Sequence, residues 1–308
     1  MATATLTAPQ THATVLEALE RDGAVLLQDL VPPETLAEMQ KCFAARLERM
    51  RWNDFDGYEK TEPFRHMVQD VLTLGQGFVD VALHPLVKSV LRDYIGEGFQ
   101  LCEAKGWLSL PTMKDFHGWH GDAWYDQTKI TDWIPREVKL AFYLSDVKSG
   151  AFTYVKGSHG KIAPRVYRTA EVDRDVDPSR IVEFLAPAGS AVLFDTSGIH
   201  RQNMPNLYPR RAIFLNYHDS KIPLQAEDVE YNRYHPLILN AAFLGNLDAE
   251  DYRILGFGDK SNYVPAFQRK AKHTAFQSVV KKSYEIKLST DRFSQRVSGR
   301  LARILGKK

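Results

Sequence analysis

The stretch from Val138 to His159, VKLAFYLSDVKSGAFTYVKGSH, is typical of a protein built from short β-strands. It holds two β-rich runs, Val138 to Leu144 and Phe152 to Val155, separated by Asp, Ser and Gly residues that are typical of turns. Runs of the same kind lie on both sides of it, at residues 99–110, Ile181 to Leu185, Ser190 to Phe194 and Ala212 to Tyr217. Several short strands at such intervals predict a β-sandwich or jelly roll, and a jelly roll can enclose a ligand pocket.

Helices are expected on both sides of this β-rich region. A short helix is predicted over residues 11–21, because Val15 and Leu19 recur at helical spacing and Asp22-Gly23 ends it before an apolar run, Ala24 to Leu27. A second helix is expected to begin at Pro32-Pro33, a third covers residues 78–95, and the chain turns helical again after Lys221. We therefore expect a mainly β protein with flanking helices. Its single domain would span residues 1–268, with the core at about 99–220, and a basic extension would follow at 269–308.

Composition is that of an ordinary globular protein. The chain has 308 residues, of which 44% are hydrophobic and 25% charged, so it is long enough to bury a full core. Cys42 and Cys102 show no Cys-x-x-Cys spacing, which argues against a disulfide framework or a zinc ribbon and suits a reducing compartment. No signal peptide pattern and no long uncharged apolar run occur. These features predict a cytoplasmic protein.

The C-terminal extension carries an unusual charge. From Arg269 onward, 12 basic residues stand against Glu285 and Asp291, which leaves 28 of the 40 basic and 36 of the 38 acidic residues before it. Within it, Phe293, Val297, Leu301, Ile304 and Leu305 recur at helical spacing among the basic residues. A basic amphipathic helix either packs on the body by its apolar stripe or makes peripheral contact with an anionic membrane or polyanion. Nucleic acid is the least favoured partner, since no binding motif accompanies the charge.

The chemistry is indicated by His120-Gly121-Asp122 and by His200, 78 residues after Asp122. Two imidazoles and one carboxylate are the ligand set of non-haem Fe(II), which leaves the opposite positions open for a co-substrate and O₂. Side chains alternate along an extended strand, so His120 and Asp122 can face one metal. His200 must arrive from elsewhere, after the buried run Gly189 to Asp195. A His-x-Asp pair in isolation is more often a hydrogen-bonded surface pair, so its context matters.

An ordered set of motifs supplies that context. Besides the His-x-Asp pair, it comprises Asp22-Gly23, Leu144-Ser145-Asp146, Gly150-Ala151-Phe152, Val155 to His159, and Phe194-Asp195 before His200 and Arg211. Together, over about residues 15–220, these resemble the phytanoyl-CoA dioxygenase family of Fe(II)/2-oxoglutarate oxygenases. The resemblance implies a double-stranded β-helix, a jelly-roll or cupin-like core with iron near one open end. It also implies Fe(II), 2-oxoglutarate and O₂ as cofactor and co-substrates, with release of succinate and CO₂. Lys156 departs from the usual Pro-Gly-Ser-His turn, and this leaves the substrate open.

The resemblance and the chemistry together assign roles to six residues. His120, Asp122 and His200 are the expected metal ligands and catalytic centre. A guanidinium matches a carboxylate bidentately, so Arg211 is expected to bind the distal carboxylate of 2-oxoglutarate. Arg210 competes for this role: it shares a strand face with Ala212, Phe214 and Asn216, and only one of the two arginines can enter the barrel, but the family spacing favours Arg211. Phe142 is expected beside 2-oxoglutarate or in the core. Arg65, in the N-terminal helical segment, would meet an anionic substrate or a cofactor carboxylate.

Other side chains near the metal pair have two interpretations. Trp119, Trp124, Tyr125 and Trp133 would line a substrate mouth or cover the end of the barrel. His117, His159 and His218 are expected to be structural.

The sequence therefore predicts an Fe(II)/2-oxoglutarate-dependent oxygenase that hydroxylates an unactivated C–H of a small or lipid-linked metabolite. Asp122 counts against a halogenase, which needs a small residue at that position to admit chloride. Desaturation, epoxidation or cyclisation of a specialised metabolite is the alternative within enzymes. A non-catalytic metal-binding jelly-roll protein is the alternative of another class, and a carboxylate-binding arginine beside the metal would argue against it.

Overall fold

A computed structural model describes residues 2–3, 10–49, 64–115, 118–122, 130, 132–161, 167–222 and 237–257, with positions 279, 282–283, 286–287, 290, 293–294 and 297. The chain divides into two compact units, Met1–Asn262 and Tyr263–Lys308, and all the strands described belong to the first. His117, Trp124, Tyr125 and most of the basic extension lie outside the described residues. The division of the domain at residue 268 stays a prediction.

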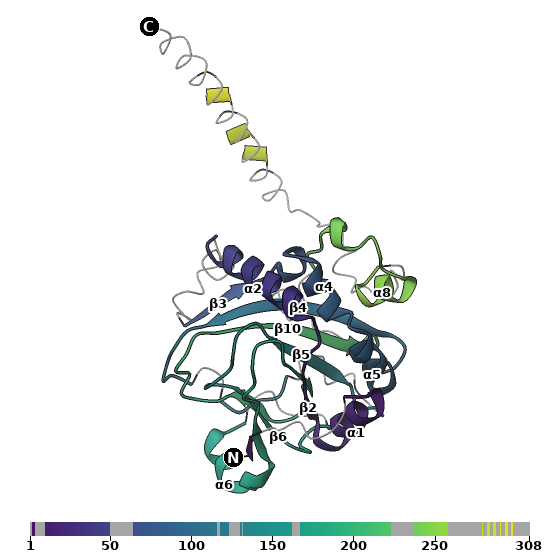
Figure 1. Cartoon of the computed structure of the whole chain (residues 1–308), viewed down its shortest axis with the longest axis vertical. Helices are drawn as coiled ribbons and strands as arrows, with labels where there is room; N and C mark the ends of the chain where they lie inside the picture. The colour runs from purple at the N-terminus through teal and green to yellow at the C-terminus, as the bar shows by residue number, and fades with distance from the viewer. Residues whose placement is uncertain are drawn as a thin grey trace. The chain divides into compact units, whose positions relative to one another are not determined.

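Two sheets form the centre of the first unit (Figure 1). The larger has six antiparallel strands in the order β2-β8-β5-β10-β4-β3. The smaller has the order β1-β7-β6-β9, antiparallel except for the β1–β7 pair. Their bounds are β1 Ala2–Thr3, β2 Ala24–Leu27, β3 Arg65–Val68, β4 Phe99–Ser109, β5 Glu137–Tyr143, β6 Phe152–Val155, β7 Ile181–Glu183, β8 Ala191–Asp195, β9 His200–Gln202 and β10 Arg210–Asp219.

Helices α1, α2, α4 and α5 contribute buried residues to one core with the larger sheet. Helix α1 begins in a capping box at Thr11 and ends at Gly23, whose left-handed backbone conformation suits a residue without Cβ. The helix expected over residues 78–95 is two helices, since Leu83 and His84 separate α4 from α5, which has Pro85 in its first turn. The helical bounds are α1 His12–Asp22, α2 Pro33–Leu47, α4 Gln76–Ala82, α5 Pro85–Ile95, α6 Thr169–Asp175 and α8 Ala249–Ile254, with 3₁₀ turns at Val71–Thr73, Pro178–Arg180 and Ala241–Phe243.

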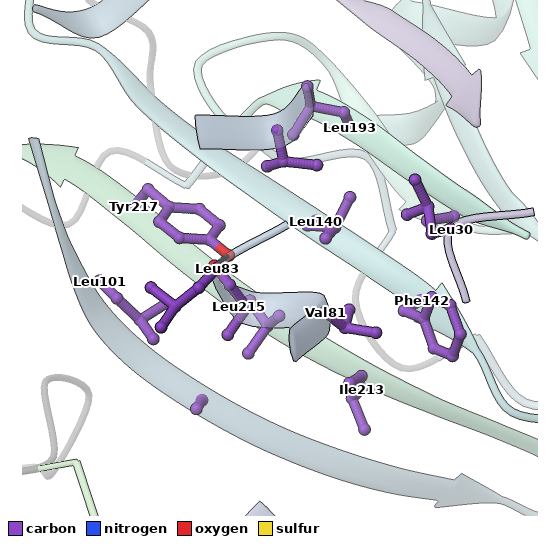
Figure 2. Packing of buried hydrophobic residues seen from close by; sticks show 14 of the residues in the cluster. Leu30, Val81, Leu83, Leu101, Leu140, Phe142, Leu193, Ile213, Leu215 and Tyr217 are labelled. Carbon is purple, nitrogen blue, oxygen red and sulfur yellow. Dashed lines mark hydrogen bonds between the residues drawn. The ribbon is translucent and has the colours of Figure 1, made fainter. Parts of the chain in front are cut away.

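Side-chain alternation gives the larger sheet two different faces. Leu140, Phe142, Leu193, Ile213 and Leu215 point into the core shared with the helices (Figure 2). Their strand neighbours face the smaller sheet and pack in a second core, made by residues such as Ala141, Tyr143, Val192, Phe194 and Ala212 with Phe152, Tyr154 and Phe184. This is the expected mainly β architecture with flanking helices. Hydrogen bonds among the described residues do not close the two sheets into a barrel.

The elements not expected from the sequence include β3, β9 and α6. Arg65 therefore lies on the edge strand β3, paired with Ser109 of β4, and not in a helical segment as predicted. His200 opens β9 instead of standing in a loop, and its neighbours Arg201 and Gln202 pair with Thr153 and Phe152 of β6. Each of these strands is three or four residues long, which is too short for a periodic pattern to identify it.

Candidate metal centre

His120 and His200 are brought together by their backbones. Each donates its N–H to the carbonyl of the other at 2.9 Å, which makes an antiparallel bridge outside the main ladders. Directly opposed residues of such a bridge place their side chains on the same side, and the two imidazole centroids lie 4.3 Å apart. Asp122 is held two residues further on, because its N–H donates to the Thr196 carbonyl at 2.8 Å.

The three side chains present donor atoms to one point. His120 Nε2 lies 3.8 Å from Asp122 Oδ1, and His200 Nε2 lies 3.6 Å from Asp122 Oδ2. One ligand atom from each residue falls within 4.8 Å of the other two. Each Nδ1 lies near a backbone carbonyl, His120 at 3.0 Å from Gly118 O and His200 at 2.8 Å from Gly198 O. A neutral imidazole that donates its Nδ1–H in this way has its Nε2 lone pair available for a metal, so the donor set fits a divalent ion.

Charge in the centre is governed by Lys139 of β5, whose Nζ lies 2.5 Å from Asp122 Oδ2. Burial alone would raise the pKa of Asp122, but the Lys139 ammonium and the two imidazoles hold that pKa well below its usual range. Burial, followed by proximity to His200, lowers the pKa of His120 to about 4. The centre is thus a carboxylate with a neutral imidazole at His120 near pH 7, which is the protonation state that metal binding requires there.

The turn before His200 is fixed by Asp195, a buried residue at the end of β8. Tyr94 Oη donates to Asp195 Oδ2 at 2.7 Å, and Ser197 donates through N and Oγ to Oδ1 at 2.9 and 2.6 Å. Gly198 completes the turn under the Tyr154 ring, because a Cβ there would lie 1.8 Å from Tyr154 Oη. These contacts place the Gly198 carbonyl that orients the His200 ring.

A cavity of about 310 Å³ opens over the three donors, between the two sheets. Phe152, Phe194 and Phe214 supply apolar surface, and Arg201, Gln202 and Ser109 supply polar groups. The Arg65 guanidinium also lines it and stacks on the Trp107 indole, 4.0 Å from the ring centroid. Aromatic rings and polar or charged groups both line this cavity, a combination found in small-molecule sites.

Arg210, and not Arg211, lines this cavity. Arg210 is 6% exposed and donates through Nη1 to the Gly150 carbonyl, while burial lowers its pKa to about 10. Arg211 lies on the opposite strand face with Ile213 and Leu215, where its N–H donates to Ser145 Oγ at 2.9 Å. The alternation argued from the sequence is correct, but the choice between the two arginines needs correction. The position of the predicted arginine was counted from His200 through a turn. A difference of one residue in the length of that turn changes the strand face on which the arginine lies.

Phe142 is also placed away from the cavity. It pairs with Ile213 and is fully buried in the core shared with the helices (Figure 2). The aromatic residue of β5 that lines the cavity is its neighbour Tyr143, whose Oη donates to the Phe184 carbonyl at 3.1 Å. Of the expected site residues, the structure therefore gathers His120, Asp122, His200 and Arg65, and it leaves out Arg211 and Phe142.

Among the residues that the structure describes, the other aromatic and histidine side chains considered in the sequence lie outside the metal centre. Trp119 is fully buried in a cluster with Val172, donates through Nε1 to Asp173 at 3.0 Å and has Arg201 stacked on it. Trp133 packs beside Ile222. Neither tryptophan lines the cavity, and each packs in a separate small apolar cluster. His159 braces a loop through a 3.1 Å contact of Nε2 with the Glu20 carbonyl.

Lys139 is the site residue that sequence reasoning missed. The signal was available, because a lysine interrupts the apolar run Val138 to Leu144 of a central strand. A charged residue that is buried at such a position needs a partner.

The family model for phytanoyl-CoA dioxygenase (PhyH) matches residues 19–203, more than half of the chain. The ectoine dioxygenase of Nocardia farcinica (strain IFM 10152) is 26% identical over 240 residues, which cover 67% of this chain and 77% of that protein.

One solved structure with a TM-score above 0.5 shows the same fold. HygX from Streptomyces hygroscopicus, crystallised with nickel, 2-oxoglutarate and hygromycin B, aligns with a TM-score of 0.51 at 17% identity, over 70% of this chain and 89% of its own. AviO1 from Streptomyces viridochromogenes Tue57 aligns with a TM-score of 0.48 at 17% identity, over 70% of this chain and 99% of its own.

Proposed function

This chain belongs to the phytanoyl-CoA dioxygenase (PhyH) family of Fe(II)- and 2-oxoglutarate-dependent oxygenases, and we propose that it hydroxylates an unactivated C–H of a small metabolite. The single observation that carries the proposal is the convergence of two imidazoles and one carboxylate at the floor of a cavity that also contains a buried arginine. A structural metal site has no use for that arginine.

His120, Asp122 and His200 would hold Fe(II), since they offer the nitrogen and oxygen donors this ion prefers and leave further positions open. When bound with 2-oxoglutarate and O₂, the iron supplies the oxidising chemistry, and 2-oxoglutarate leaves as succinate and CO₂. The Gly118 and Gly198 carbonyls orient the two rings for this task.

Arg210 would bind the distal carboxylate of 2-oxoglutarate. Its planar guanidinium matches a carboxylate bidentately, and a desolvated cation binds an anion more strongly than an exposed one does. Among the described residues no acidic side chain makes an ion pair with Arg210, so the group is available for a ligand. Phe152, Phe194 and Phe214 would exclude water around it.

A small, polar metabolite is the proposed substrate class. The cavity volume of about 310 Å³ suits a small molecule, and its lining combines aromatic rings with the Arg65 and Arg201 guanidinium groups. A relative named for ectoine, a small molecule, supports the same class. Arg65 keeps its proposed role as a contact of an anionic group on substrate or co-substrate.

Localisation in the cytoplasm and the role of the basic extension stay predictions. Within the described part of the chain, no helix combines the length and the apolar character needed to cross a membrane. A lipid-linked substrate presented from an anionic surface would depend on residues 269–308.

Release of succinate from 2-oxoglutarate, measured across a metabolite panel, tests the proposal. Hydroxylation adds one oxygen atom to the product, whereas desaturation or ring closure removes two hydrogen atoms, so mass spectrometry separates the outcomes. The His120→Ala, His200→Ala double variant is the control. Substrate-dependent succinate release that this variant retains would refute the assignment, and a wild-type protein that binds metal but never consumes 2-oxoglutarate would favour a non-catalytic protein.

A further inference from the structure

Lys139 occupies a position that the proposed chemistry does not require. It stands in the middle of β5, pairs with Asn216 of β10 and Phe194 of β8, and lines the cavity beside the three donors. Only 15% of its side chain is exposed. A fixed ammonium this close to a site for a divalent cation repels that cation, so its presence needs an explanation.

The contact geometry supplies one. Lys139 Nζ lies 2.5 Å from Oδ2 of Asp122, the same oxygen that lies 3.6 Å from His200 Nε2. The other carboxylate oxygen, Oδ1, is the one on the His120 side, at 3.8 Å from Nε2. A carboxylate that donates both oxygens to a metal occupies one more coordination position than a carboxylate that donates one. A lysine engaged with one oxygen works against the two-oxygen mode.

We propose that Lys139 is a positioning residue that keeps Asp122 a one-oxygen metal ligand, so that the positions opposite the protein ligands stay open for 2-oxoglutarate and O₂. The ammonium holds Oδ2, which would leave Oδ1 as the oxygen available to the metal. Repulsion between the Lys139 ammonium and the metal lowers the affinity for the metal. In return, one coordination position stays open for the co-substrate. The inference rests on the proposed function, because it needs the metal at His120, Asp122 and His200.

A second buried lysine–aspartate pair, away from the metal donors, serves as a control for the effect of losing an ion pair on stability. Lys88 of α5 lies 2.5 Å from Asp251 of α8, and the two side chains are 14% and 12% exposed, against 15% and 10% for Lys139 and Asp122. Both pairs are buried lysine–aspartate contacts within the same unit, and Lys88 does not line the metal cavity. Lys88→Met is therefore the control for loss of a buried ion pair.

The experiment loads the full chain with Mn(II), which replaces Fe(II) without turnover. Two quantities are measured for the wild type, Lys139→Met and Lys88→Met: the number of exchangeable waters on bound Mn(II), from water-proton relaxation, and the affinity of the Mn(II)-loaded protein for 2-oxoglutarate, from calorimetry. Lys139→Met should bind Mn(II) with fewer waters and should bind 2-oxoglutarate about 10- to 100-fold more weakly, the range typical of residues that orient metal ligands. Lys88→Met should match the wild type in both.

A Lys139→Met protein with the wild-type water number and wild-type 2-oxoglutarate affinity would overturn the inference. So would equal losses in Lys139→Met and Lys88→Met. Should Lys139→Met fail to fold by circular dichroism, Lys139→Ala carries the same test, since its shorter side chain leaves room for water at Asp122. Failure of the wild type itself to bind Mn(II) would instead refute the proposed function.

Discussion

Replacement of Arg210 by methionine should strongly lower the affinity for 2-oxoglutarate while leaving the fold intact. Arg210 is 6% exposed at the cavity wall, and the hydrogen bond that the structure gives its guanidinium goes to the Gly150 carbonyl. Loss of one partner from a buried charge pair costs about 3–5 kcal/mol. At about 1.4 kcal/mol per tenfold change, the affinity for 2-oxoglutarate should fall by roughly two to four orders of magnitude.

The assay is calorimetric titration of 2-oxoglutarate into Mn(II)-loaded protein, with Arg211→Met as the matched control on the opposite strand face. Arg211→Met should bind like the wild type. Without ligand, Arg210→Met should melt no lower than the wild type, because a desolvated cation without an acidic partner costs stability. A larger loss of affinity in Arg211→Met than in Arg210→Met would refute the assignment of the cavity face.

Three further predictions follow from the site and its supports. His120→Ala and His200→Ala should each abolish turnover, whereas Asp122→Ala should abolish it but retain weak metal binding in equilibrium dialysis; full turnover by any of them would contradict the ligand set. Tyr94→Phe removes the 2.7 Å hydrogen bond to buried Asp195, so it should lower the free energy of unfolding by about 1–3 kcal/mol and weaken metal binding. Tyr252→Phe removes a 3.0 Å hydrogen bond from a more exposed tyrosine to the Leu244 carbonyl, so it should cost less stability and leave metal binding unchanged. Burial lowers the pKa of His218 to about 4. His218 therefore binds a proton near pH 6.5 in the unfolded chain but only near pH 4 in the folded protein. The free energy of unfolding should fall as the pH is lowered from about 6.5 to about 4. Urea unfolding at several pH values should show a smaller loss in His218→Gln, and an unchanged loss would exclude this cause.

Local patterns were sufficient for most of the strands. Residues 24–27 and 152–155 are strands with the predicted bounds, because each is an apolar run bounded by turn residues. The strand over Arg210–Asp219 begins two residues before the predicted Ala212. That small difference brings Arg210 into the sheet opposite Ser109, and so to the cavity wall.

Partners distant in sequence could not be predicted. The bridge between His120 and His200 and the contact of Lys139 with Asp122 depend on how two sheets meet, which no local spacing encodes. Phe142 shows the same limit. Alternation predicts which residues of β5 share a face with it, but whether that face meets the cavity or the helices depends on where α1, α2, α4 and α5 pack.

His120, Asp122 and His200 should together hold one Fe(II) to which 2-oxoglutarate also binds. Anomalous diffraction at the iron edge, from crystals prepared with Fe(II) and 2-oxoglutarate in the absence of O₂, tests it most directly. We expect one iron peak between the two Nε2 atoms and the Asp122 carboxylate, with 2-oxoglutarate on the iron and its far carboxylate on Arg210. An iron peak elsewhere, or 2-oxoglutarate bound away from the iron, would contradict it.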